Sequence, residues 1–150
     1  MRNRFAIGLL FSLLAIGGAA HAKSFAGPQP VDPDQAEWST PPQIPGLQAA
    51  WLLGDSESAA PYLMQVKLAK DAVIPPHRHS DTRHTLVLEG VLYIGFGEPF
   101  DKEALVAVPA GRVYEVKAGT PHFLTALDGA VRYQETGHGP TTTEMVGAKP

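Results

Sequence analysis

The sequence has 150 residues and a formal net charge of −3 at pH 7, which allows one modest domain with its own core. The mildly acidic balance, without a basic patch, argues against a nucleic-acid-binding protein. The chain contains no cysteine, so disulfides, thiolate nucleophiles and iron–sulfur clusters are excluded, and histidine or carboxylate must hold any transition metal.

The first 22 residues have the pattern of a secretory signal peptide. Arg2 and Arg4 provide a basic start, residues 5–16 form a nearly unbroken apolar run, and Ala20-His21-Ala22 matches a small-x-small cleavage site. The apolar run is too short for an ordinary membrane span, and an uncleaved anchor is the alternative interpretation. We therefore expect a periplasmic or secreted protein, free of the membrane after cleavage. Because cleavage removes two arginines and no acid, the mature net charge would be −5.

The mature chain divides into a proline-rich arm, residues 23–45, and a domain, residues 46–146. The arm has no sustained periodicity, which predicts an extended segment that could lie over the domain with Trp38 or Ile44 as an anchor. The domain consists of strand-length apolar runs separated by Gly, Pro and Asp, which favours an all-β sandwich or barrel. The expected strands are 47–54, 62–69, 84–97, 104–111, 113–119, 122–129 and 130–137, while residues 100–105 could form a helical turn or a loop.

Two short elements contain the candidate metal ligands. In PPHRHSDTRH, the Pro-Pro pair favours an extended chain, and alternation in a strand places His77 and His79 on the same face, where both can reach one ion. About forty residues later, Pro121 sets a rigid turn that orients His122. Taken alone, each element has an ordinary alternative: a histidine pair on a surface strand, and a buried or turn-capping histidine.

Together the two elements resemble the two motifs of the cupin superfamily, G-x5-H-x-H-x(3,4)-E-x6-G and G-x5-P-x-G-x2-H-x3-N. The matching positions are His77, His79, Gly90, Gly111, Gly119 and His122. The resemblance spans roughly residues 62–139 and is greatest to small, often exported single-domain cupins. It implies a double-stranded β-helix, the cupin jelly-roll barrel, with one divalent transition metal bound by the three histidines. Zinc, iron, copper, manganese and nickel are all compatible with nitrogen ligands.

The chain departs from the family pattern most seriously at Arg83, which stands where the family has its glutamate ligand. Asp71, Lys117 and Ala126 replace the family glycine, proline and asparagine. A guanidinium about 5 Å from a divalent ion would be repelled by roughly 6–7 kcal/mol at an effective dielectric constant of 20. Arg83 therefore points away, or an anion lies between it and the metal, or the site has no metal. The second alternative makes Arg83 a candidate for binding a small carboxylate or phosphate.

His84 could fill the vacant ligand position, although a strand bulge would be needed to turn it inward. The alternative is a histidine packed between the sheets and bonded to Asp81 or to a backbone carbonyl. Gln65, Tyr93 and Tyr133 are candidates for lining a ligand pocket, with solvent-facing positions as the alternative. The acidic residues Glu89, Glu115 and Glu135 are interpreted as members of solvated strand faces rather than as paired catalytic acids.

Three functional hypotheses follow. The first is a metal-dependent enzyme, oxygenase-like, acting on a small acidic molecule whose carboxylate Arg83 orients. This hypothesis is suggested by the similarity of a three-histidine face to the iron site of thiol dioxygenases in the same superfamily. The second is a non-catalytic module that binds a small molecule or a metal, and the third is a metal-free degenerate cupin with a structural or partner-binding role. The expected partner is a small anion, and the chain could form a homodimer.

Overall fold

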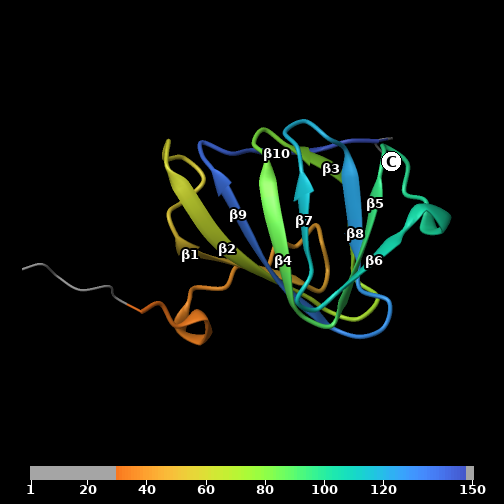
Figure 1. Ribbon diagram of the computed structural model, residues 1–150, viewed down its shortest axis with the longest axis horizontal. Helices are drawn as coiled ribbons and strands as arrows, with labels where there is room; N and C mark the ends of the chain where they lie inside the picture. The colour runs from red at the N-terminus through yellow and green to blue at the C-terminus, as the bar shows by residue number, and fades with distance from the viewer. Residues whose placement is uncertain (1–29, 148–150) are drawn as a thin grey trace, which may run out of the picture. The chain divides into compact units, whose positions relative to one another are not determined.

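The computed structural model describes residues 30–147 of the chain (Figure 1). The predicted signal peptide and the first part of the predicted arm lie outside the described residues. Within residues 30–147, no helix is long and apolar enough to cross a membrane.

The described residues form ten strands and two single-turn helices, which confirms the predicted all-β class. The elements are η1 (Pro33–Gln35), β1 (Leu47–Leu53), β2 (Pro61–Leu68), β3 (Val73–His79), β4 (Arg83–Glu89), β5 (Val91–Phe96), η2 (Lys102–Ala104), β6 (Val106–Pro109), β7 (Val113–Val116), β8 (His122–Thr125), β9 (Val131–His138) and β10 (Thr143–Met145). The sequence pattern did not predict β10, because its three residues are exposed and carry no apolar alternation.

The strands pair into two five-stranded antiparallel sheets that face each other (Figure 1). Sheet A has the order β1-β2-β9-β4-β7, and sheet B has the order β10-β3-β8-β5-β6. Consecutive strands therefore alternate between the sheets at several points, as in a jelly-roll barrel. Strand β3, which carries the histidine pair, lies between β10 and β8 in sheet B.

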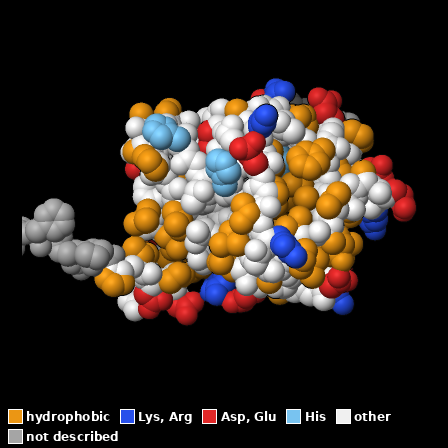
Figure 2. Space-filling view, viewed as in Figure 1, with side chains coloured by type: hydrophobic (Ala, Val, Ile, Leu, Met, Phe, Trp, Pro, Cys, Tyr) orange, Lys and Arg blue, Asp and Glu red, His pale blue; other side chains and the backbone are white. Residues whose placement is uncertain are grey.

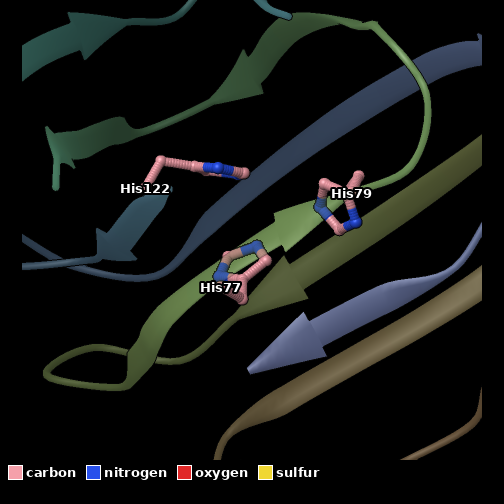
Figure 3. A group of neighbouring side chains, drawn as sticks. All are labelled: His77, His79 and His122. Atoms are coloured by element: carbon pink, nitrogen blue, oxygen red, sulfur yellow. The ribbon is translucent and has the colours of Figure 1, made fainter. Parts of the chain in front are cut away.

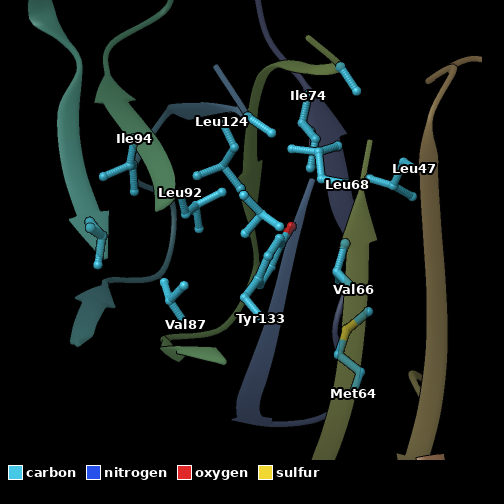
Figure 4. Close-up of a cluster of buried hydrophobic side chains, with 14 of the residues drawn as sticks. Leu47, Met64, Val66, Leu68, Ile74, Val87, Leu92, Ile94, Leu124 and Tyr133 are labelled. Atoms are coloured by element: carbon cyan, nitrogen blue, oxygen red, sulfur yellow. The ribbon is translucent and has the colours of Figure 1, made fainter. Parts of the chain in front are cut away.

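Alternating side chains from both sheets build the core between them (Figure 4). Val66 and Tyr133 of sheet A belong to the same buried cluster as Leu92 and Leu124 of sheet B. The inward-facing row changes character along β4, where Val87 is apolar but Thr85 and Arg83 are polar and buried. The apolar core thus gives way to buried polar groups toward the end of the barrel at which β4 begins.

The second half of the arm lies against the domain. Ser39 and Ala49 exchange backbone hydrogen bonds of 2.8 and 3.0 Å, which aligns the arm beside β1. The ammonium of Lys67 lies 3.9 Å from the Trp38 ring centroid, and Ile44 packs against the buried core cluster. Both residues considered as anchors therefore contact the domain, through a cation–π interaction and through apolar packing.

Candidate metal centre and its cavity

The fold brings together the three histidines that the motifs singled out (Figure 3). His77 and His79 come from β3 and His122 begins the neighbouring strand β8, directly opposite His77 in the sheet register. All three are buried, with 2–7% of their surface exposed. One potential ligating atom from each lies within 4.8 Å of the others, so the three side chains converge on one position, as the ligands of a single metal ion do.

Each histidine is oriented by a hydrogen bond at its Nδ1 atom. The Nδ1–H groups of His77 and His122 donate to the carbonyls of Pro75 and Thr120 at 2.8 and 3.0 Å. His79 Nδ1 lies 3.0 Å from the hydroxyl of Thr143 on β10. A backbone acceptor at Nδ1 leaves the Nε2 lone pair available, which is the usual arrangement around metal-binding imidazoles. The donor set therefore fits a divalent transition metal.

The surroundings keep these imidazoles neutral, which is the form that ligates a metal. Burial lowers the pKa of His77 to about 4, and the neighbouring His122 contributes. Burial also lowers the pKa of His79 to about 2, with the Arg83 cation as the next cause. The pKa of His122 is lowered by burial as well.

Arg83 points into the barrel, where the protein itself supplies its partners: two carboxylates and one hydroxyl. Its Nη1 donates to Glu135 Oε2 at 2.8 Å, its Nη2 donates to the Thr141 hydroxyl at 3.0 Å, and its Nε lies 3.5 Å from Asp81 Oδ1. Burial alone would lower the pKa of Arg83, but the Glu135 carboxylate, aided by Tyr62 and Asp81, raises it above its usual value. The guanidinium is therefore a cation fixed in a buried hydrogen-bond network. Its three nitrogen atoms already contact groups of the protein, so it is not arranged to bind a ligand carboxylate.

The hydrogen-bond network continues from Arg83 through Asp81 to Tyr62 and Thr141. The Oδ2 atom of Asp81 accepts a hydrogen bond of 2.6 Å from the Tyr62 hydroxyl, and its Oδ1 accepts one from the Thr141 hydroxyl. Both carboxylates near Arg83 are buried, with side chains about 7% exposed. Two buried carboxylates compensate one buried cation, and each is also hydrogen-bonded, as buried charges require.

A cavity of about 290 Å³ lies between the two sheets at this end of the barrel. Its polar end is formed by His77, His79, Arg83, Glu135 and Thr143. The remaining wall is apolar and includes Pro41, Ile44, Met64, Val66, Leu124 and Met145. Tyr133, one of the predicted pocket residues, also lines it. The volume is near the lower limit for small-molecule sites.

Three other sequence expectations are corrected by the structure. His84 is not near the metal centre: its side chain is 56% exposed, with Nε2 3.1 Å from Glu115 on the outer face of sheet A. Pairing of β4 with β7 is regular at this point, so there is no bulge to turn His84 inward. Gln65 is buried but does not line the cavity: it lies beside Gln134 on the face of β2 opposite Met64 and Val66. Tyr93 lies outside the barrel, where its hydroxyl donates to Asp128.

Sequence reasoning missed Glu135, which was interpreted as part of a solvated face. The structure shows it 5% exposed, in the cavity wall and bonded to Arg83. The signal was present in the period-two alternation, because Val131, Tyr133 and Glu135 share one face of β9 and Tyr133 was already a pocket candidate. Asp81 and Thr141 lie between strands, where no periodicity predicts their direction.

Two facing five-stranded sheets with a histidine triad on the inner face of one of them define a cupin. The sequence agrees, since the chain belongs to the ChrR cupin-like domain family, whose model matches residues 27–122 and so includes all three histidines. No curated protein shows significant sequence similarity to the chain.

Solved structures support the same fold. The polyketide cyclase RemF from Streptomyces resistomycificus has a TM-score of 0.62 and 18% identity, over 75% of this chain and 80% of that one. An RmlC-like cupin from Shewanella frigidimarina has a TM-score of 0.58 and 17% identity, over 71% and 86%. A sugar phosphate isomerase of the cupin superfamily from Silicibacter pomeroyi has a TM-score of 0.61 and 17% identity, over 78% and 81%. At these identities the likeness shows the fold alone.

Proposed function

We propose that this chain is an exported cupin that binds one divalent transition metal through His77, His79 and His122 and uses it on a small molecule in the adjoining cavity. The observation that carries the proposal is the convergence of three buried, neutral imidazoles beside a largely apolar pocket. Three protein ligands leave coordination positions open, which is characteristic of reactive rather than structural sites.

A bound ion would supply Lewis acidity or, if it is redox-active, activation of dioxygen. The protein's own groups would orient the substrate and exclude water around that ion. Arg83 and Glu135 hold each other in a fixed geometry in the cavity wall, and Glu135 is the carboxylate available there for moving a proton. An oxygenase-like enzyme is one activity that a three-histidine metal site beside such a cavity could support.

The fixed charges favour an anionic substrate once a metal is bound. With neutral histidines, Arg83 contributes one positive charge, and Glu135 and Asp81 contribute one negative charge each. A divalent ion would change this balance from −1 to +1, and a singly charged acid at the ion would neutralise it. We therefore expect the acidic group at the metal, whereas the sequence alone had assigned it to Arg83.

The test is the metal content of the protein. The full sequence is expressed and purified from the periplasm without a chelator or an affinity tag, and elemental analysis is combined with mass spectrometry of the N-terminus. We expect about one equivalent of a transition metal, and Lys23 as the first residue of the mature chain.

The double variant His77→Ala/His122→Ala should lose the metal, because one imidazole cannot hold it. His84→Ala is the matched control and should retain it, since that histidine lies on the outer surface. If the wild-type protein binds no zinc, iron or copper even after reconstitution, the metal-free degenerate cupin replaces the proposal. A non-catalytic binding module remains if metal is bound but no small acid is turned over.

A further inference from the structure

We infer that the molecule taken into this cavity is a compact acid with an apolar body, and not a sugar or a polyhydroxylated acid. The inference rests on the proposed metal centre, because the metal supplies the position for the acidic group. It concerns the remainder of the molecule, which must fit against the walls of a cavity of about 290 Å³.

At the polar end of the cavity, Arg83 and Thr143 already have hydrogen-bond partners in the protein. The guanidinium of Arg83 is bonded to Glu135 and Thr141, and the Thr143 hydroxyl is bonded to His79. A substrate hydroxyl could take over these groups only by breaking an existing hydrogen bond, which is buried in the case of Arg83. The polar end therefore offers the metal and one constrained carboxylate, which suits one acidic group better than a row of hydroxyls.

The walls beyond that end are mostly apolar and come from the arm and from several strands. Met64 and Val66 are contributed by β2, Ile44 by the arm, and Met145 by β10. Side chains of this type give a hydroxyl no hydrogen-bond partner, and an unpaired buried hydroxyl weakens binding by roughly tenfold. Each additional methylene in the same place strengthens binding by about fourfold.

Two of these wall residues lie outside the central strands and control the shape of the pocket. Ile44 reaches the core cluster from the arm, and Met145 lies on the edge strand next to the histidine pair, opposite His77 in the register. A ligand attached to the metal would therefore direct its body toward them. Ile44 and Met145 should therefore determine which apolar groups, beyond the acidic group of the ligand, the pocket accepts.

The experiment uses zinc-loaded protein of measured metal content and three monocarboxylates: acetate, hexanoate and 6-hydroxyhexanoate. Isothermal titration calorimetry should show hexanoate binding at least tenfold more tightly than either of the others, because only its body is both long and apolar. Gluconate, a polyhydroxylated six-carbon acid, should bind no more tightly than acetate once its removal of zinc is corrected for by metal analysis.

Variants link the preference to the walls. Ile44→Asn and Met145→Gln should each reduce the advantage of hexanoate over 6-hydroxyhexanoate to about threefold or less, without loss of zinc. Val106→Asn, at an exposed apolar position on β6, is the matched control and should keep the wild-type preference. Met145 is about half exposed, so Met145→Gln should fold even if Ile44→Asn does not.

The failures of the two proposals are distinguishable. If zinc is bound but the three acids bind equally, or gluconate binds most tightly, the apolar-body inference is wrong and the metal centre stands. If no metal is retained, the proposed function fails first. The same acids are then titrated into the metal-free protein, where the lack of any chain-length trend would overturn the inference too.

Discussion

At the scale of single residues, the unusual feature is the arginine at the position of the family glutamate. A cation beside a metal centre needs an anion, and the structure supplies one from the neighbouring strand: Glu135 lies 2.8 Å from the Arg83 guanidinium. Negative charge is thus kept in the cavity, although on β9 and not on β4. The arrangement removes the objection that Arg83 would repel the ion without compensation.

Removal of Arg83 alone should destabilise the protein strongly. Arg83→Met leaves Glu135 and Asp81 buried without their cation, and the free energy of unfolding should fall by about 3–5 kcal/mol, as measured by urea denaturation. Arg78→Met is the matched control: it breaks the exposed pair with Glu144 and should cost about 1 kcal/mol or less.

The double variant Arg83→Met/Glu135→Leu should recover much of the loss, because it replaces both members of the closest buried ion pair with apolar side chains of similar size. Asp81 keeps its hydrogen bonds from Tyr62 and Thr141 in this variant. Equal losses in the single and double variants would contradict the ion-pair account. Arg83→Glu is a poor test of metal retention, since it would place three carboxylates together.

The histidine triad could be predicted because its members are marked by spacing. Two of them alternate on one strand, and the third follows a proline turn at the distance that the family motif requires. The partners of Arg83 could not be predicted in the same way. Asp81 and Thr141 come from connections between strands, and their contact with Arg83 depends on how β4, β9 and the segment before β10 meet in space.

At the scale of elements, the position of His122 depends on the packing of β8 against β5. Gly95 of β5 lies opposite Phe123 of β8, whose ring is fully buried against Phe100. A Cβ atom at residue 95 would overlap the Phe123 ring, so this strand pair requires glycine there. Since Phe123 follows His122 directly, a displacement of the ring should also shift His122 relative to His77 and His79.

Gly95→Ala should therefore affect both stability and metal binding. We expect a loss of about 1–3 kcal/mol in the free energy of unfolding from overpacking, together with a several-fold weaker affinity for zinc. Denaturation and competition with a fluorescent chelator would measure the two effects. Phe123→Leu provides room for the added methyl group, so the two substitutions together should cost less than the sum of their separate effects. Strict additivity would show that the ring does not transmit the change.

Strand β10, at the edge of sheet B, is the element that the sequence could not predict. The main apolar runs were recognised as strands because they are bounded by turn residues, and the resemblance to cupins predicted how they close into a barrel. Strand β10 has no such pattern, yet it places Thr143 against His79 and Met145 in the cavity wall. Whether such a short edge segment forms a strand depends on pairing and packing with its neighbours more than on its own β-propensity.

At the scale of the whole molecule, the two sheets make different contributions to the site. Sheet B carries the three metal-binding candidates on adjacent strands, whereas sheet A carries Arg83 and Glu135. The hydrophobic cluster joins the sheets independently of the histidines. A metal at the triad would therefore bind a preformed site and would not be needed to hold the sheets together.

This division predicts that the protein stays folded when the metal is removed. Treatment with a chelator should leave the far-ultraviolet circular dichroism spectrum unchanged, because the strands are paired by backbone hydrogen bonds and packed by an apolar core. Zinc at about 100 times its dissociation constant should then add about 2.7 kcal/mol of stability, which corresponds to a rise in Tm of roughly 8–15 °C. The variant His77→Ala/His122→Ala should show the same spectrum and no rise. An apo protein that unfolds on chelation, as small zinc domains do, would mean that the metal has a structural role and that the open-site interpretation is wrong.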